Sequence, residues 1–166
     1  MSSFLQLSPV HRESSASALY DLWSMEDRIA WQLDAWILHN ARSLADFDRD
    51  SASSLRRCST TVRSELKRAL LGLGRTVVRL PLVREQNVEL SAVRSLQQVF
   101  SDTRRAQQLT SRALLLSDVS GDFTRASVLA DVQELQRDRL ALIRSLHTAT
   151  LASTTTSAPT FRPSAA

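Results

Sequence analysis

The chain has 166 residues, of which 43% are hydrophobic and 23% are charged, and its formal net charge is +4. This length supports one domain with its own core, and the composition is that of a globular protein rather than a disordered one. Only three glycines and four prolines are present. These are too few for the frequent turns of a sheet, so the composition favours long helices.

Two features of the sequence bear on where the protein resides. Cys58 is the single cysteine, so no intramolecular disulfide can form, which argues against an oxidising extracellular environment. No apolar run approaches the roughly 20 residues that a membrane-spanning helix needs. We therefore expect an intracellular protein, located in the cytoplasm.

A first helix is predicted from about Ser15 to Phe47. Its apolar residues recur at helical spacing and share one face, as in an amphipathic helix that buries one side. This face is formed by Leu19, Leu22, Trp23, Ile29, Ala30, Leu33, Trp36, Ile37, Ala41 and Leu44. The segment Asp46–Asp50 is predicted to break the helix, and Ser51–Ser54 supplies capping residues for the next one.

Two tryptophans of this helix lie on different faces. Trp36 shares the main apolar face, and we interpret it as a core residue. Trp31 points the other way, together with Leu38 and the small Ala35, and forms a second, narrow apolar ridge. This ridge either packs against a second neighbour inside the bundle or docks another protein chain, since large aromatic side chains contribute much of the burial energy at such contacts.

A second helix is predicted from about Ser53 to Val78, with an apolar face formed by Leu55, Cys58, Val62, Leu66, Ala69 and Leu73. Gly72 and Gly74 weaken its last turns, and Pro81 ends or kinks the run. A third helix follows from about Leu82 to Leu116. Its apolar face comprises Val93, Leu96, Phe100, Ala106, Leu109 and Ala113.

The segment Ser117–Asp122 is the clearest loop in the sequence. It precedes a fourth helix, from about Asp122 to Leu151, whose apolar face comprises Phe123, Ala126, Leu129, Val132, Leu135, Leu140, Ile143 and Leu146. The polar, proline-containing residues 152–166 are expected to be a disordered tail, and residues 1–14 a flexible N-terminus. The folded domain is thus predicted to span residues 15–151.

Four long amphipathic helices predict an all-α protein. Each would have roughly 26 to 35 residues, or about 40 to 50 Å of length. Short loops between them would make neighbours antiparallel. The result is either an up-down four-helix bundle or two coiled-coil hairpins that complete their core with another chain.

No credible reactive constellation is found. None of the three histidines has an acidic residue three positions before it, as a di-iron bundle requires. Cys58 lies on an apolar face and is interpreted as a buried structural thiol, and Gly72–Gly74 as a helix end rather than a phosphate loop. We therefore expect a non-enzymatic protein with no catalytic residue, metal, cofactor or small-molecule substrate.

The charges are unevenly distributed along the chain. Residues 1–50 contain four basic and eight acidic side chains, whereas residues 51–80 contain seven basic and one acidic. The basic set is Arg56, Arg57, Arg63, Lys67, Arg68, Arg75 and Arg79. These residues either pair with the acidic first helix or bind an anionic polymer or membrane surface. The modest net charge, and the lack of aromatic residues interleaved for base stacking, argue against nucleic acid and against a membrane surface.

The leading hypothesis is a helical interaction or scaffold protein, a subunit of a larger assembly. It would bind other helical chains, as a homo- or hetero-oligomer, through Trp31, Ala35 and Leu38 and through complementary charge. The alternative is an anion binder that uses the arginines of residues 51–80.

Overall fold

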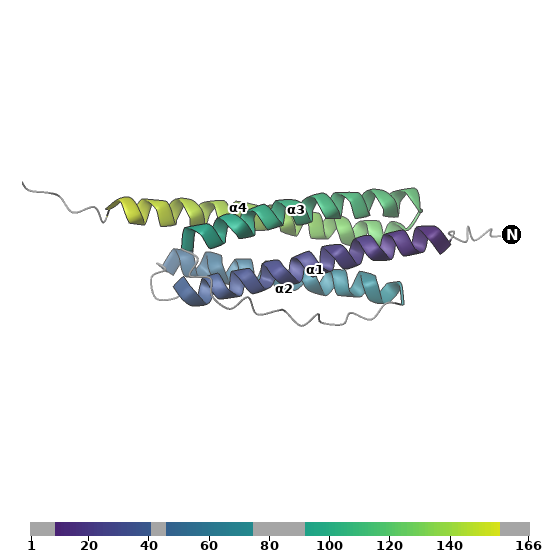
Figure 1. Ribbon diagram of the computed structural model, residues 1–166, viewed down its shortest axis with the longest axis horizontal. Helices are drawn as coiled ribbons and strands as arrows, with labels where there is room; N and C mark the ends of the chain where they lie inside the picture. The colour runs from purple at the N-terminus through teal and green to yellow at the C-terminus, as the bar shows by residue number, and fades with distance from the viewer. Residues whose placement is uncertain (1–8, 41–45, 75–91, 157–166) are drawn as a thin grey trace, which may run out of the picture.

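A computed structural model of the chain describes residues 9–40, 46–74 and 92–156. Within these ranges the chain forms four helices and no strand (Figure 1). They are α1 (Pro9–Asn40), α2 (Asp46–Gly72), α3 (Ala92–Val119) and α4 (Phe123–Thr156). The predicted all-α four-helix bundle is confirmed.

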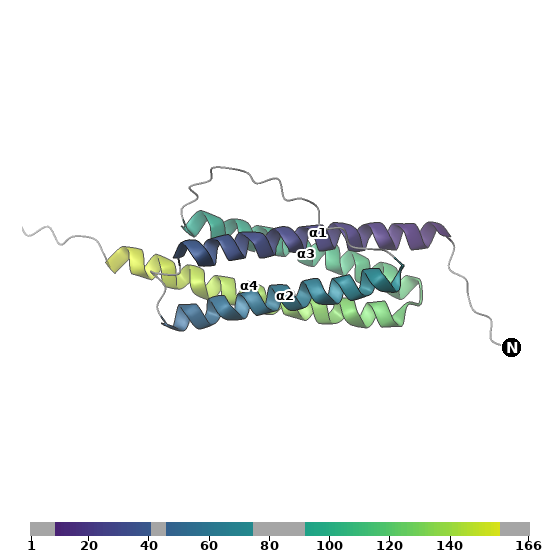
Figure 2. The same ribbon diagram turned by 90° about the horizontal axis from the view of Figure 1, so that it is seen from below.

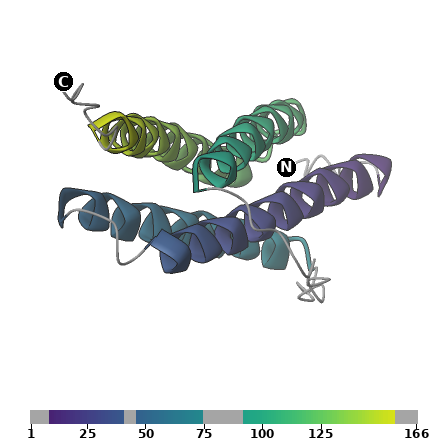
Figure 3. The ribbon, with the colours of Figure 1, turned by 60° about the vertical axis from the view of Figure 1, so that its left-hand side comes forward.

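The four helices are arranged as two antiparallel pairs that pack face to face. The pair α1–α2 forms one layer and the pair α3–α4 the other, with α1 on α3 and α2 on α4 (Figure 3). Helices α1 and α4 run in one direction, and α2 and α3 run in the other (Figures 1 and 2). Every helix therefore lies antiparallel to both of its neighbours, while α2 and α3 are diagonal and parallel.

The parallel course of α2 and α3 refines the predicted connectivity. A short loop would have made these two helices antiparallel neighbours. Residues 73–91 separate them instead, and that many residues span up to about 60 Å when extended. This exceeds the roughly 40 Å length of α2, so α3 can begin at the opposite end of the bundle. Residues 75–91 themselves lie outside the described ranges.

The core runs along the shared axis of the two pairs and is built from the predicted apolar faces. Helix α1 contributes its bulkiest members, Trp23 and Trp36, which are 6% and 3% exposed. The largest fully buried apolar side chains are Leu19, Leu22, Ile29, Leu33, Leu55, Leu66, Leu70, Leu96, Leu129, Ile143 and Leu146. The interpretation of Trp36 as a core residue is confirmed.

The ends of α1 and the start of α2 differ from the prediction. Helix α1 begins at Pro9, before the predicted Ser15, because proline suits the first position of a helix, where its missing N–H has no partner to lose. It ends at Asn40, whose side-chain amide donates to the carbonyl of Trp36 over 2.8 Å. The predicted break at Asp46–Asp50 is wrong. These residues begin α2, where acidic side chains complement the helix dipole.

The end of α2 also shifts. Helix α2 ends at Gly72 rather than Val78, and Gly74 has a φ of 69°, which favours glycine. The interpretation of this segment as a helix end is thus confirmed. Helix α3 is described from Ala92 onward, and the predicted helical residues 75–91 lie outside the described part of the chain.

The turn between α3 and α4 falls where the loop was predicted. Gly121 has a φ of 70°, and the N–H groups of Gly121 and Asp122 donate to the carbonyls of Asp118 and Ser117 over 3.0 and 2.9 Å. This Schellman motif ends α3. Asp122 then caps α4, because its carboxylate accepts from the N–H of Arg125 over 3.0 Å. Helix α4 continues to Thr156, past the predicted Leu151, and the predicted tail beyond it lies outside the described residues.

Candidate partner-binding surface

The narrow ridge of α1 lies on the outside of the bundle. Trp31 is 45% exposed and Leu38 is 80% exposed, and Ala35 between them is exposed as well. The spacing of four and three residues places all three side chains on one face of the helix. The core-facing side of the same helix is already covered by α2 and α3. The ridge therefore has no neighbour inside the described bundle.

The outer edge of the ridge is joined to α2 by ion pairs. Asp34, about one turn from both Trp31 and Leu38, accepts a hydrogen bond from Nε of Arg56 over 2.7 Å. One heptad away on both helices, Asp27 accepts from Arg63 over 2.7 Å. The interpretation that the acidic first helix pairs with the basic second helix is confirmed. A step of seven residues back along α1 matches a step of seven residues forward along α2, so both pairs share one antiparallel register.

Of the seven predicted basic residues, the five that lie in the described ranges do not form one cluster. Arg56 and Arg63 are paired with α1, and Arg68 forms an ion pair with Glu65 of its own helix over 3.0 Å. Arg57 and Lys67 are exposed, and no ion pair of theirs is found among the residues that the structure describes. Arg75 and Arg79 lie outside the described ranges.

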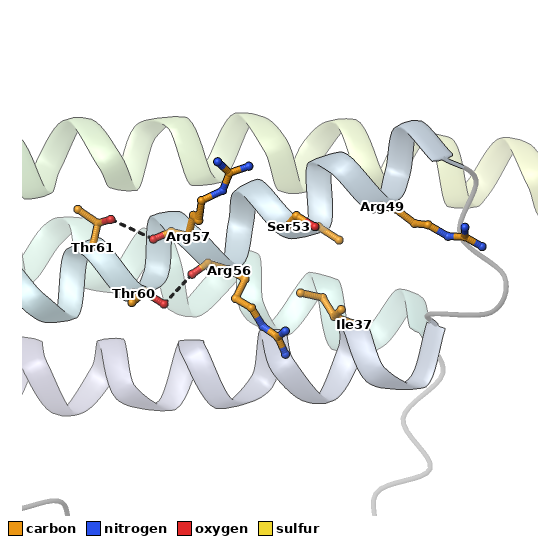
Figure 4. A pocket seen from close by; sticks show the side chains of 8 residues that line it. Ile37, Arg49, Ser53, Arg56, Arg57, Thr60 and Thr61 are labelled. Carbon is orange, nitrogen blue, oxygen red and sulfur yellow. Dashed lines mark hydrogen bonds between the residues drawn. The ribbon is translucent and has the colours of Figure 1, made fainter.

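A hollow of about 610 Å³ lies beside the ridge, between the last turns of α1 and the first half of α2. Figure 4 shows Arg56 directed toward α1, Arg57 directed to the opposite side of α2, and Arg49 nearer the start of that helix. The lining also includes hydroxyl groups and small or apolar side chains. The described residues around the hollow are Ile37, Arg49, Ala52, Ser53, Arg56, Arg57, Thr60 and Thr61, and none of them is acidic.

A second set of exposed apolar residues lies at the other end of α2 and α3. Its members are Leu71, Leu115, Val119 and Phe123, which are 53% to 77% exposed. They lie near the same end of the bundle because α2 and α3 run in the same direction (Figure 1). This set was not predicted from the sequence, since Phe123 was placed on the buried face of its helix. That assignment of Phe123 to the core is wrong.

A buried polar cluster at the centre of the bundle was also missed. The guanidinium of Arg139 on α4 donates two hydrogen bonds to the carboxylate of Glu26 on α1, over 2.5 and 2.7 Å. Gln136 donates to the same carboxylate over 2.8 Å, and Ser59 of α2 lies 3.4 Å from Arg139. Glu26, Gln136 and Arg139 are all 0% exposed. The pair thus connects two diagonal helices across the core.

One feature of the sequence indicated this cluster. Glu26 lies at helical spacing from Leu22, Leu19 and Ile29, so its side chain had to point toward the core. A buried carboxylate requires a partner, and the sequence contains many arginines. It does not indicate which one, because the pairing depends on how α1 and α4 are aligned across the bundle.

Cys58 borders this cluster and is buried, as predicted. Its thiol donates to the carbonyl of Leu135 over 3.0 Å. Burial raises the pKa of the Cys58 thiol to about 11, against a smaller opposing effect of Arg139. The sulfur therefore remains protonated at neutral pH, and a thiol is a much weaker nucleophile than a thiolate.

Comparisons with known proteins do not assign the chain to a family. No protein-family model matches it, and no match was found among curated proteins or solved structures. In the described part of the chain, no three side chains of histidine, cysteine, aspartate or glutamate are grouped as metal ligands would be. None of the described helices is apolar enough over its length to cross a membrane.

Proposed function

We propose that the protein is a non-enzymatic helical interaction module of the cytoplasm, a subunit of a larger assembly that works without a cofactor. One observation carries the proposal. Trp31, Ala35 and Leu38 form an exposed apolar ridge on a helix whose opposite face is already buried in a complete core. A Trp that is 45% exposed beside a Leu that is 80% exposed is typical of an anchor that a partner covers.

The spacing of the ridge supports a helical partner. Residues 31, 35 and 38 follow the alternation of four and three that brings side chains against a second helix. Ala35, the smallest of the three, would let the partner's backbone approach between the two large side chains. The alternative, an anionic polymer or membrane surface on α2, has less support because Arg63 and Arg68 are ion-paired within the chain.

The test is a photo-crosslinking amino acid placed at Leu38 of the full chain in its own cells, followed by identification of the cross-linked proteins. We expect one defined protein to be cross-linked at this position, and we expect its co-purification to be lost in the variant Trp31→Ser/Leu38→Ser. Both side chains are largely solvent-exposed, so the change in the free energy of unfolding should stay below about 1 kcal/mol. Circular dichroism checks that helicity is kept.

The matched control is Leu115→Ser/Val119→Ser, which removes two equally exposed apolar side chains from α3 at the far end of the bundle. It should retain the partner. Equal loss in the control, or collapse of helicity in the ridge variant, would contradict the proposed role of the ridge.

A further inference from the structure

The ridge and the hollow form one continuous face. Asp34 lies between Trp31 and Leu38 along α1, and its ion pair with Arg56 places that arginine level with the middle of the ridge. Ile37, the neighbour of Leu38, lines the hollow together with Ser53 of α2. The antiparallel register set by the two ion pairs therefore places Arg56 and Arg57 along the same stretch as the apolar ridge.

The basic side of this face is able to bind further carboxylates. Asp34 accepts from Nε of Arg56, and no hydrogen bond of the terminal amino groups of Arg56 is found among the described residues. The side chains of Arg56 and Asp34 are 59% and 52% exposed, so their pair is readily shared with an incoming group. Arg57 adds an exposed guanidinium on the other side of the hollow (Figure 4).

We propose that this face binds an acidic amphipathic helix of a partner protein. Its apolar side would cover Trp31 and Leu38, and its carboxylates would reach Arg56 and Arg57. This inference rests on the proposed function and names the chemistry of the partner. Guanidinium groups form bidentate hydrogen bonds with carboxylates. Charge complementarity at the edge of an apolar contact determines which partner binds.

Other occupants fit the face less well. A nucleic acid offers no aliphatic surface for Leu38, and a lipid surface is flat, whereas the arginines border a hollow between two helices. A second copy of this chain would bring its own arginines to the contact. The three exposed ridge residues alone would bury less than the roughly 800 Å² per partner of a stable interface. A partner segment that also contacts the arginines would bury more surface, and therefore fits the face better.

The experiment uses two labelled peptides of about 20 residues, or about 30 Å of helix. Both carry leucines at alternating spacings of three and four. One has glutamate at the flanking positions, and the other has lysine there. Fluorescence anisotropy measures their binding to the full chain at low and high salt. We expect the acidic peptide to bind and the basic peptide not to bind. The affinity of the acidic peptide should fall as the salt concentration rises.

Protein variants locate the site. Arg56→Gln/Arg57→Gln should weaken binding of the acidic peptide about tenfold, since two exposed charge pairs are lost. The control Lys67→Gln/Arg68→Gln makes the same change of charge about three turns farther along α2, and it should stay within about twofold of the wild type. Trp31→Ser should remove apolar contact with the acidic peptide and weaken its binding as well.

Three outcomes overturn the inference. Equal binding of both peptides, or no effect of Arg56→Gln/Arg57→Gln, would mean that the ridge binds helices without regard to charge, and the proposed function would survive. If the acidic peptide does not bind, an acidic helix is excluded as the partner. Cross-linking at Leu38 would still test the proposed function independently. Arginine-dependent co-sedimentation with phosphatidylserine vesicles, without peptide binding, would assign the face to a membrane surface instead.

Discussion

Glu26 and Arg139 place two opposite charges at the centre of an apolar core, where neither side chain is exposed. Removing one partner leaves the other charge buried without compensation, which typically costs about 3 to 5 kcal/mol. Arg139→Met should therefore lower the free energy of unfolding by about this amount. Urea denaturation followed by circular dichroism measures the change.

Two further variants distinguish the effect of an unpaired buried charge on stability from the effect of losing a side chain. In Glu26→Leu/Arg139→Met both charges are gone, and stability should recover to near or above that of the wild type. Nε of Arg139 and Oε1 of Gln136 have no hydrogen-bond partner in the described structure, which already favours the apolar replacement. Asp34→Asn, at an exposed pair, should cost less than about 1 kcal/mol. A double variant as unstable as Arg139→Met would contradict this account.

The exposure of Trp31 depends on how many neighbours α1 has. A helical wheel shows that α1 carries two apolar faces, and the sequence alone leaves the narrow one equally compatible with a second internal neighbour. In the bundle, α1 is packed by α2 and α3 on the broad side only. The position of Trp36 could be predicted because it lies within the broad face, whereas the position of Trp31 could not.

Gly121 and Gly72 provide a matched pair of helix-end substitutions. A Cβ added at either glycine meets nothing within 4 Å, so only the backbone conformation distinguishes them. At Gly121, with a φ of 70°, alanine should lower the free energy of unfolding by about 1 to 2 kcal/mol. At Gly72, the last residue of α2, alanine should raise it by up to about 1 kcal/mol. Thermal unfolding of both variants measures the difference, and changes of the same sign would contradict the assigned turn.

The same helix ends show what local sequence can and cannot predict. The turn within the predicted loop Ser117–Asp122 was predicted because a glycine, a capping aspartate and a change of hydrophobic pattern all indicate it, although α3 continues to Val119, three residues into that loop. Asp46–Asp50 was misread because acidic residues suit both a break and the first turn of a helix. The choice depends on whether α2 needs those residues to reach the end of α1, which is a tertiary requirement.

The connectivity of the whole bundle depends on the length of the segment between α2 and α3 rather than on the local pattern of apolar residues. Amphipathic faces indicate that each helix buries one side, but they do not identify the helix that covers it. The sequence therefore left open whether two hairpins pair within one chain or with another. In the structure, α1–α2 and α3–α4 cover each other, and the buried link between Glu26 and Arg139 joins one hairpin to the other.

A core closed within one chain leaves two small exposed apolar areas for self-association, the ridge on α1 and the set at the opposite end of the bundle formed by Leu71, Leu115, Val119 and Phe123. The ridge of Trp31, Ala35 and Leu38 is too small to hold two copies together stably. We therefore expect the purified chain to have a mass near 18.5 kDa in solution, measured by light scattering on a sizing column over a range of concentrations. A defined dimer that reverts to monomer in Trp31→Ser/Leu38→Ser would show that the ridge binds a second copy. A dimer that persists in this variant would instead place the contact outside the ridge, either at the exposed apolar residues Leu71, Leu115, Val119 and Phe123 or through hairpins that pair between chains.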